Sequence, residues 1–153
     1  MNAQHILGNK TWTEIEAESS WSLFKILGEF VKGYEILNRI GPCVSIFGSA
    51  RTKPDNDYYK YTEEIAERLT GMGYGIITGG GPGIMSAANK GAYEEKSKSI
   101  GLNIELPNEQ SSNPYLDENI TFNYFFSRKV MLVKSSSARI YFPGGYGTAD
   151  ELM

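Results

Sequence analysis

The sequence predicts an α/β protein: a Rossmann-like, doubly wound parallel sheet preceded by an N-terminal helical extension. Two observations lead to this prediction. Short apolar segments alternate with segments of helical period, which is the pattern of parallel strands joined by helices. The 17 glycines gather mainly where apolar segments end, and glycine at such points lets the backbone turn sharply or approach a ligand closely. The length, 153 residues, is that of one ordinary domain.

Residues 1–40 are predicted to form the extension, and residues 41–153 the nucleotide-binding domain. The first 18 residues are polar and weakly patterned, so we expect a loose lead-in. Between Trp21 and Asn38, apolar residues recur every three or four positions. This period predicts an amphipathic helix that packs against the main domain or a second subunit. The apolar positions are Leu23, Leu27, Phe30, Tyr34 and Leu37.

Within the domain, strands and helices are expected to alternate. The predicted strands are Cys43–Phe47, Tyr74–Thr78, Ser99–Ile104, Asn119–Phe122 and Ala138–Phe142. The predicted helices are Tyr58–Leu69, Pro82–Tyr93 and Phe125–Lys134. A polar loop is expected at 107–118. Another helix should follow Gly145, and Met153 would lie about one turn into it, so we expect the C-terminal part of the domain to be missing from this sequence.

Composition excludes several classes of function. The formal net charge is −3, so no basic field favours nucleic acid or a membrane surface. One histidine, His5, and one cysteine, Cys43, are too few for zinc or Ser-His-Asp chemistry, and we predict no metal or redox cofactor. The sequence contains neither an apolar span of membrane length nor a signal core, which predicts a cytoplasmic protein.

Glycine-rich loops are the main candidate binding elements. In an open α/β sheet, ligands bind beyond the carboxyl ends of the strands. The Gly79–Gly83 loop follows the second predicted strand and suits either an anion or nucleotide site, or only a tight turn. It is not a Walker A loop, and Ile84 replaces the third glycine of a dinucleotide fingerprint. Glu105, at the end of the third strand, keeps NAD binding as a weaker alternative.

A second loop, Pro143–Thr148, contains three glycines and a threonine that suit a phosphate cradle. Glu151 follows it. The sequence allows either a functional carboxylate here or a capping-box partner of Thr148. Arg128 and Lys129 begin a helix, where the dipole disfavours cations. They are therefore either aimed at an anion or a solvated surface pair.

Together, these segments resemble the LONELY GUY (LOG) family of cytokinin riboside 5′-monophosphate phosphoribohydrolases, long misannotated as lysine decarboxylases. Pro143–Glu151 matches the family pattern P-G-G-x-G-T-x-x-E. Phe47–Ala50, Gly79–Met85 and Arg128-Lys129 match in the family's order, so the resemblance covers about residues 42–153.

The resemblance implies a dimeric, Rossmann-like hydrolase that cleaves N6-modified AMP into free base and ribose 5-phosphate; some relatives act on AMP or other nucleoside monophosphates. It implies that Arg128 and Glu151 are the essential pair. The implied substrate-binding residues are Gly48, Ser49, Gly80, Gly81, Gly83, Met85, Lys129, Gly144, Gly145, Gly147 and Thr148. Glu151 would stabilise positive charge on the sugar or activate water. Arg128 would hold phosphate or ribose oxygens, or assist the departing base.

Three other hypotheses stay open at this point. The enzyme could be a general AMP nucleosidase. The chain could instead be a non-catalytic carrier of a nucleotide or cofactor, as in the related molybdenum-cofactor carrier proteins, or a structural module. A lysine decarboxylase is disfavoured, because no recognisable Schiff-base constellation for pyridoxal phosphate is present.

Overall fold

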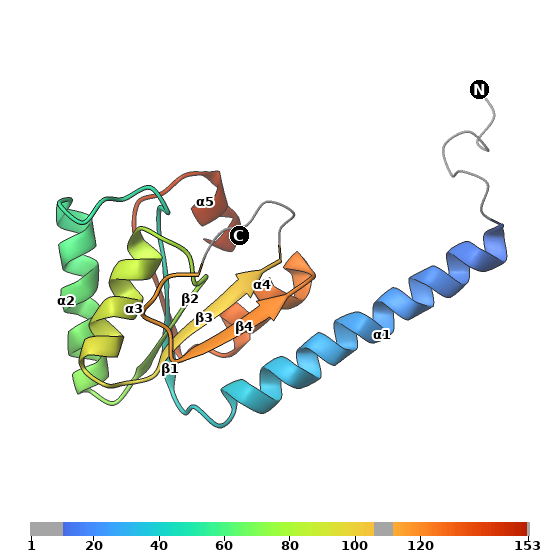
Figure 1. The fold of residues 1–153 in the computed structure, drawn as a ribbon, viewed down its shortest axis with the longest axis horizontal. Helices are drawn as coiled ribbons and strands as arrows, with labels where there is room; N and C mark the ends of the chain where they lie inside the picture. The colour runs from blue at the N-terminus through green and yellow to red at the C-terminus, as the bar shows by residue number, and fades with distance from the viewer. Residues whose placement is uncertain (1–10, 106–111, 153) are drawn as a thin grey trace.

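A computed structural model describes residues 11–105 and 112–152 of the chain. Five parallel strands form one sheet, with helices on both faces (Figure 1). The strands are β1 (Cys43–Phe47), β2 (Gly75–Thr78), β3 (Ser99–Ile104), β4 (Glu118–Phe122) and β5 (Ala138–Tyr141). The helices are α1 (Trp12–Leu37), α2 (Asp57–Gly71), α3 (Ile84–Glu94), α4 (Phe125–Lys134) and α5 (Tyr146–Leu152).

The strand order β4-β3-β2-β1-β5 confirms the predicted doubly wound fold. The chain starts at β1, moves outward to β4 and returns to pair β5 with the other side of β1. The order therefore reverses at β1. The carboxyl ends beside such a switch point form the crevice in which open α/β sheets bind ligands.

Each face of the sheet has its own apolar core. On one face, side chains of β1 and β2 pack with small residues of α2 and α3, such as Ala66 and Ala88. On the other face, Phe47, Ile77 and Leu102 pack with α4 and the end of α1. Strand residues alternate between the two faces, so both cores are filled by the near-continuous apolar runs that distinguish buried parallel strands.

Helix α1 is longer than the sequence suggested. It begins at Trp12 instead of Trp21, so the expected loose lead-in is wrong for the described residues up to 18. Thr11 and Glu14 explain the difference, because they form a capping box that satisfies backbone N–H groups at the helix start. The helix projects from the α/β body as an arm, and its C-terminal part meets the body (Figure 1). There, Gly33 packs on Met131.

The other boundaries agree closely with prediction. The clearest difference is at α3, which begins at Ile84 instead of Pro82, because Gly83 is its N-cap and has φ of 70°. Residues 1–10, much of the predicted loop at 107–118, and Met153 lie outside the described residues. The proposed domain boundary at residue 41 stays a prediction. No helix in the described ranges has both the length and the apolar character needed to cross a membrane.

Candidate active site

A cavity of about 720 Å³ lies at the carboxyl ends of the central strands, bordered by the first turns of α4 and α5. Its lining joins segments that are distant in the sequence. The predicted site residues that line it are Gly48, Ser49, Met85, Arg128, Gly145, Gly147, Thr148 and Glu151. The structure therefore brings both members of the predicted essential pair into one cavity with parts of three predicted loops.

Arg128 and Glu151 form an ion pair at the cavity wall. Nη1 of Arg128 donates to Oε1 of Glu151 at 2.8 Å, and the side chains are only 12% and 14% exposed. Nε of Arg128 also donates to the carbonyl of Leu102, at 2.6 Å, at the end of β3. The guanidinium thus links a strand end to α5. Arg128 is therefore not the solvated surface group that the sequence alone allowed.

Of the two carboxylate oxygens of Glu151, Oε1 accepts a hydrogen bond from Arg128 and Oε2 does not. Its Oε2 is buried, and among the described residues no group donates a hydrogen bond to it. The capping-box alternative does not fit, because α5 begins at Tyr146 and the N–H groups of Thr148 and Ala149 already donate to the carbonyl of Gly145. The Tyr141 hydroxyl donates to the backbone carbonyl of Glu151 and anchors the end of α5.

Gly79 leaves room for the arginine. A Cβ placed on Gly79 would lie 2.6 Å from Nη2 of Arg128 and 2.9 Å from the sulfur of Met85. Both distances are shorter than side-chain packing permits. The absence of a side chain at position 79 therefore allows the guanidinium to lie over the end of β2.

The remaining glycines of that loop do not line the cavity. Gly80, Gly81 and Gly83 are buried, and a Cβ on Gly83 would collide with the backbone of Ser49. Asn113 fastens the loop, because its backbone N–H donates to Gly80 and its side chain donates to the carbonyl of Gly81. These glycines let the loops at the ends of β1 and β2 pack closely against each other, next to the cavity.

The Pro143–Thr148 segment, which runs into the start of α5, contains three exposed glycines. A Cβ on Gly145 or Gly147 would meet nothing, whereas one on Gly144 would collide with the Thr148 side chain. Thr148 thus packs on Gly144, which does not line the cavity. Backbone N–H groups at the start of a helix commonly bind anions, and here they lie beside the cavity.

Two other charged candidates lie outside the lining. Lys129 is 3.4 Å from Asp150, on α5, in a partly exposed ion pair. Glu105, the candidate ribose-binding acid of the NAD alternative, is exposed just after β3. The sequence analysis missed several lining residues: Phe47, Ile104, Phe125, Tyr146 and Asp150. Phe47, Tyr146 and Asp150 lie inside the motif segments quoted from the sequence, whereas Ile104 and Phe125 were marked only by their places at the end of β3 and the start of α4.

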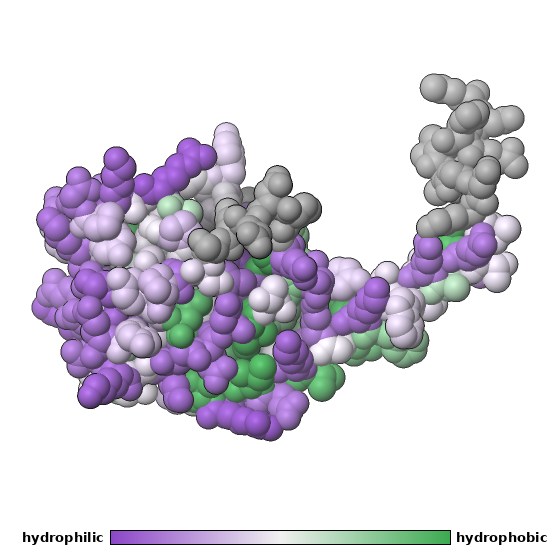
Figure 2. Space-filling view, viewed as in Figure 1, coloured by the Kyte–Doolittle hydropathy of each residue, from purple (hydrophilic) through white to green (hydrophobic). Residues whose placement is uncertain are grey.

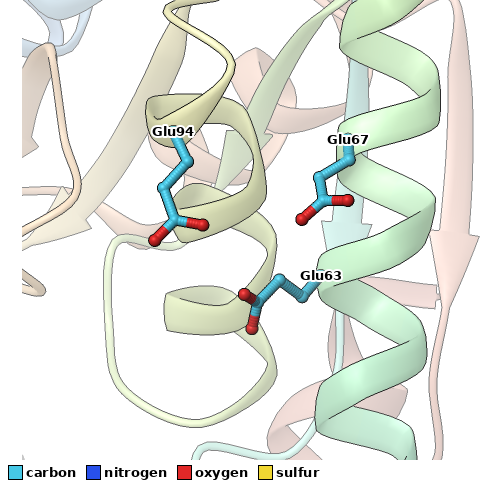
Figure 3. A group of neighbouring side chains, drawn as sticks. All are labelled: Glu63, Glu67 and Glu94. Carbon is cyan, nitrogen blue, oxygen red and sulfur yellow. The ribbon is translucent and has the colours of Figure 1, made fainter.

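A separate group of carboxylates joins α2 to α3 (Figure 3). Oxygens of Glu63, Glu67 and Glu94 lie within 4.8 Å of one another. Lys90 occupies the same place, donating to Glu63 at 2.6 Å and lying 3.7 Å from Glu94. The hydrogen bond to Glu63, with the neighbouring negative charges, raises the pKa of Lys90 despite its partial burial. We interpret the group as an ion-pair network between the helices.

The fold and cavity define an open α/β protein with a strand-end site, and comparisons with known proteins agree with that class. Residues 85–153 match a family described as "Possible lysine decarboxylase". An uncharacterized protein of Archaeoglobus fulgidus is 34% identical over 99 residues, which is 64% of either chain. Pyrimidine/purine nucleotide 5′-monophosphate nucleosidase of Escherichia coli K12 is 33% identical over 104 residues, 62% of this chain.

Among solved structures, the molybdenum cofactor carrier protein of Chlamydomonas reinhardtii is similar with a TM-score of 0.60 and 27% identity, covering 72% of this chain and 68% of that one. The chain spans 64% of the length of the Archaeoglobus protein and 23% of the nucleosidase. The family match covers residues 85–153, which include both Arg128 and Glu151.

Proposed function

We propose that the protein hydrolyses the N-glycosidic bond of a nucleoside 5′-monophosphate, either a cytokinin riboside 5′-monophosphate or AMP, to free base and ribose 5-phosphate. The observation that carries this proposal is the nearly buried Arg128–Glu151 pair at the wall of the cavity, in which one carboxylate oxygen of Glu151 has no hydrogen-bond partner among the described residues. The likeness to a nucleotide nucleosidase supports the same class of substrate.

The proposed substrate spans the cavity from the α5 loop to the end of β3. We place its phosphate at Gly145–Thr148, where open backbone and a hydroxyl line the cavity. The base would then face the apolar part of the lining formed by Met85, Ile104 and Phe125. This arrangement sets the ribose beside Glu151, between the two ends. It follows a general property of ligand sites, in which apolar walls hold the ligand and a few polar groups orient it.

The chemistry assigned to Glu151 is that of a carboxylate beside a sugar carbon that becomes cationic. As the C1′–N bond breaks, its electron pair leaves with the base and positive charge builds on the ribose. Glu151 stabilises that charge and accepts a proton from the water that attacks C1′. The leaving base takes up one proton from solvent, and Glu151 returns the proton of the attacking water to solvent, so that one water is consumed overall. Arg128 orients Glu151 and offers its remaining N–H groups either to ribose and phosphate oxygens or to the base.

A decarboxylase function, suggested by the family description, has less support from the site. A pyridoxal phosphate enzyme needs a lysine that forms a Schiff base with the cofactor. Among the described residues that line the cavity there is no lysine. Lys129, the nearest in sequence to Arg128, is paired with Asp150.

The second candidate is a non-catalytic carrier, which the likeness to the Chlamydomonas carrier protein favours. The two candidates differ in what they require of Glu151. A carrier needs a cradle for its cargo, whereas a hydrolase also needs a carboxylate at the bond that breaks. The buried, unpartnered oxygen of Glu151 favours the hydrolase.

Chromatographic detection of free base tests the proposal directly. The protein is incubated with AMP or with isopentenyladenosine monophosphate, and base and ribose 5-phosphate are measured over time. Release of base by the wild type, abolished in Glu151→Gln, is the expected result, and the ratio of the two rates ranks the substrates. A folded protein that binds both nucleotides but releases no base would contradict the hydrolase and favour the carrier.

We also propose that the protein forms a homodimer through α1. The outward side of that helix carries Leu23, Phe24, Leu27, Val31 and Tyr34, each at least 41% exposed; we call these residues the α1 stripe. Figure 2 shows hydrophobic surface along the α1 arm. Contiguous exposed apolar surface of this kind marks interaction sites. The cytoplasmic location expected from the sequence stays a prediction.

A second copy of α1 suits the α1 stripe because the first half of the helix is more acidic than the second. The first half contains Glu14, Glu16 and Glu18 and no lysine or arginine, whereas the second half contains Lys25 and Lys32 together with Glu29 and Glu35. An antiparallel pair would place the acidic half of one copy beside the lysines of the other. Such a self-complementary contact is the rule for twofold dimers.

A further inference from the structure

Helix α4, which carries Arg128, has no side-chain cap of its own. The first N–H groups of any α-helix lack partners within the helix and must be satisfied by other groups. The N-cap residue of α4 is Tyr124, whose side chain makes no capping hydrogen bond. A tyrosine cannot do what Ser, Thr, Asp or Asn does at this position.

Glu29, far away in the sequence on α1, accepts hydrogen bonds around the start of α4, from the residue before its N-cap and from its first turn. Its Oε1 accepts hydrogen bonds from the backbone N–H of Asn123 at 2.6 Å and from the side-chain amide of Asn123 at 2.9 Å. Its Oε2 accepts a hydrogen bond from the hydroxyl of Ser127, in the first turn of α4. A carboxylate is also favoured here by the positive end of the helix dipole.

The titration of Glu29 agrees with this geometry. Burial by itself would raise the pKa of the carboxyl group, but hydrogen bonds from Ser127 and Asn123 outweigh that effect and lower the pKa below its usual value. The ionised form is therefore the one that the surroundings of Glu29 stabilise.

The turn held by Glu29 is the turn that positions the candidate catalytic arginine. Arg128 directly follows Ser127, and its backbone N–H donates to the Tyr124 carbonyl at 3.2 Å. Its side chain then reaches Leu102 at 2.6 Å and Glu151 at 2.8 Å. A shift of this turn would move the guanidinium away from both acceptors, because Arg128 is close to the helix start.

We propose that Glu29 is a positioning residue: by capping α4 from the N-terminal extension, it holds Arg128 in register with Glu151. Its effect on turnover rests on the proposed hydrolase function, whereas its effect on the Arg128 side chain does not. In this proposal, the N-terminal extension takes part in the site because its residue Glu29 fixes the position of Arg128.

Other contacts keep α1 docked when Glu29 is changed. The rings of Phe30 and Phe126 are packed edge to face with their centroids 6.0 Å apart, and Gly33 packs on Met131. A purely structural role would therefore show itself as lost stability, while a positioning role would change the state of Arg128 in a protein that is still folded.

The experiment compares Glu29→Ala and Glu29→Gln with the wild type, and Glu35→Ala is the matched control. Glu35 is on the same helix, but it is exposed, and it pairs with Arg39 at 2.7 Å. NMR measures the hydrogen exchange and chemical shift of the Arg128 Nε–H group, assigned with Arg128→Lys. Steady-state base release gives kcat and KM, and urea unfolding gives the midpoint for each protein.

We expect Glu29→Ala to speed Arg128 Nε–H exchange by about tenfold and to lower kcat by about tenfold to a hundredfold, with a smaller change in KM, because small displacements of catalytic groups reduce rates by such factors. Glu29→Gln, which keeps an acceptor oxygen, should fall between Glu29→Ala and the wild type. Glu35→Ala should behave as the wild type does.

If Glu29→Ala is folded and its Arg128 Nε–H group exchanges at the wild-type rate, the positioning role is overturned, even if the activity of the variant has changed. If Glu29→Ala does not fold, Glu29→Gln decides, and wild-type exchange in that variant overturns the proposal. If the wild type releases no base while exchange still responds to Glu29, the hydrolase function fails and the positioning role stands.

Discussion

Arg128 and Glu151 meet at 2.8 Å, although they come from two different helices, α4 and α5. The pair is nearly buried, and only one of the two carboxylate oxygens is used. An unsatisfied buried acceptor lowers stability, by about 1–3 kcal/mol for an ordinary group. Such a group is retained most easily where a ligand supplies the missing donor.

Changing Glu151 to glutamine tests what the free oxygen does. The side chain keeps its size but can no longer accept a proton or stabilise a cationic sugar as a carboxylate does. We expect AMP binding to persist and kcat for base release to fall by about 10²–10⁴-fold, the usual contribution of a general base. Calorimetry and base release by chromatography measure the two quantities.

Glu105→Gln is the charge-matched control, because Glu105 is exposed and does not line the cavity. It should leave turnover unchanged. Full turnover in Glu151→Gln would show that Glu151 only holds Arg128 in place.

Gly79→Ala tests the space beneath the arginine. The added methyl group would lie 2.6 Å from Nη2 of Arg128 and must displace it. We expect turnover to fall by about tenfold or more, because the guanidinium would lose its alignment with Glu151. Gly71→Ala is the control, since a Cβ there meets nothing and the residue ends helix α2. Equal activity in the two variants would contradict the steric relationship between Gly79 and Arg128.

Thr148→Val tests the phosphate end of the cavity. Valine keeps the packing of the side chain on Gly144 but removes the hydroxyl. We expect affinity for AMP to fall by about tenfold, which is the loss of one hydrogen bond to a charged group, and affinity for adenosine to change less. Calorimetry with both ligands measures the difference. Equal weakening of the two would place the phosphate elsewhere in the cavity.

The sequence predicted most of the sheet because its three central strands, β1 to β3, are largely apolar and buried on both faces. It predicted the pairing of Arg128 with Glu151 only through the family motif, since the residues come from separate helices and no local period relates them. The start of α1 was mistaken because Glu14–Ser20 has little apolar periodicity, whereas the Thr11 capping box begins the helix there.

The glycine loop after β2 shows a second limit of sequence reasoning. Its pattern suits a ligand loop, yet Gly80, Gly81 and Gly83 are buried against Asn103, Asn113 and the backbone of Ser49. These contacts depend on segments that meet only in the folded chain. The same is true of Glu29, whose partners are 94 and 98 positions away in the sequence.

Acid titration tests the charge of Glu29 in the folded protein. Because its pKa is lowered on folding, the ionised carboxylate stabilises the folded state fully above the usual pKa of 4.5, and this contribution is lost as the pH falls below 4.5. Relative to Glu29→Gln, the wild type should be more stable by about 1 kcal/mol at pH 6, and this difference should shrink towards pH 3. Urea unfolding at each pH measures the difference.

Lys25, Lys32 and Tyr124 line the same groove as Glu29 and are present in both proteins, so their contributions cancel in the comparison. A difference that does not change between pH 6 and pH 3 would show that Glu29 contributes no more as a carboxylate than as a neutral acceptor.

Sedimentation equilibrium tests the proposed dimer through the α1 stripe. Leu27 is 51% exposed and Val31 is 64% exposed, so Leu27→Glu with Val31→Glu adds charge to the centre of the stripe without disturbing the core. We expect the wild type to be dimeric at micromolar concentration and the double variant to be monomeric, because like charges in the centre of an apolar contact are strongly unfavourable. Met72→Glu, at a 72% exposed site beyond α2, is the control and should stay dimeric. A monomeric wild type would contradict the dimer, whereas a dimer that persists in the double variant would place the interface on another surface.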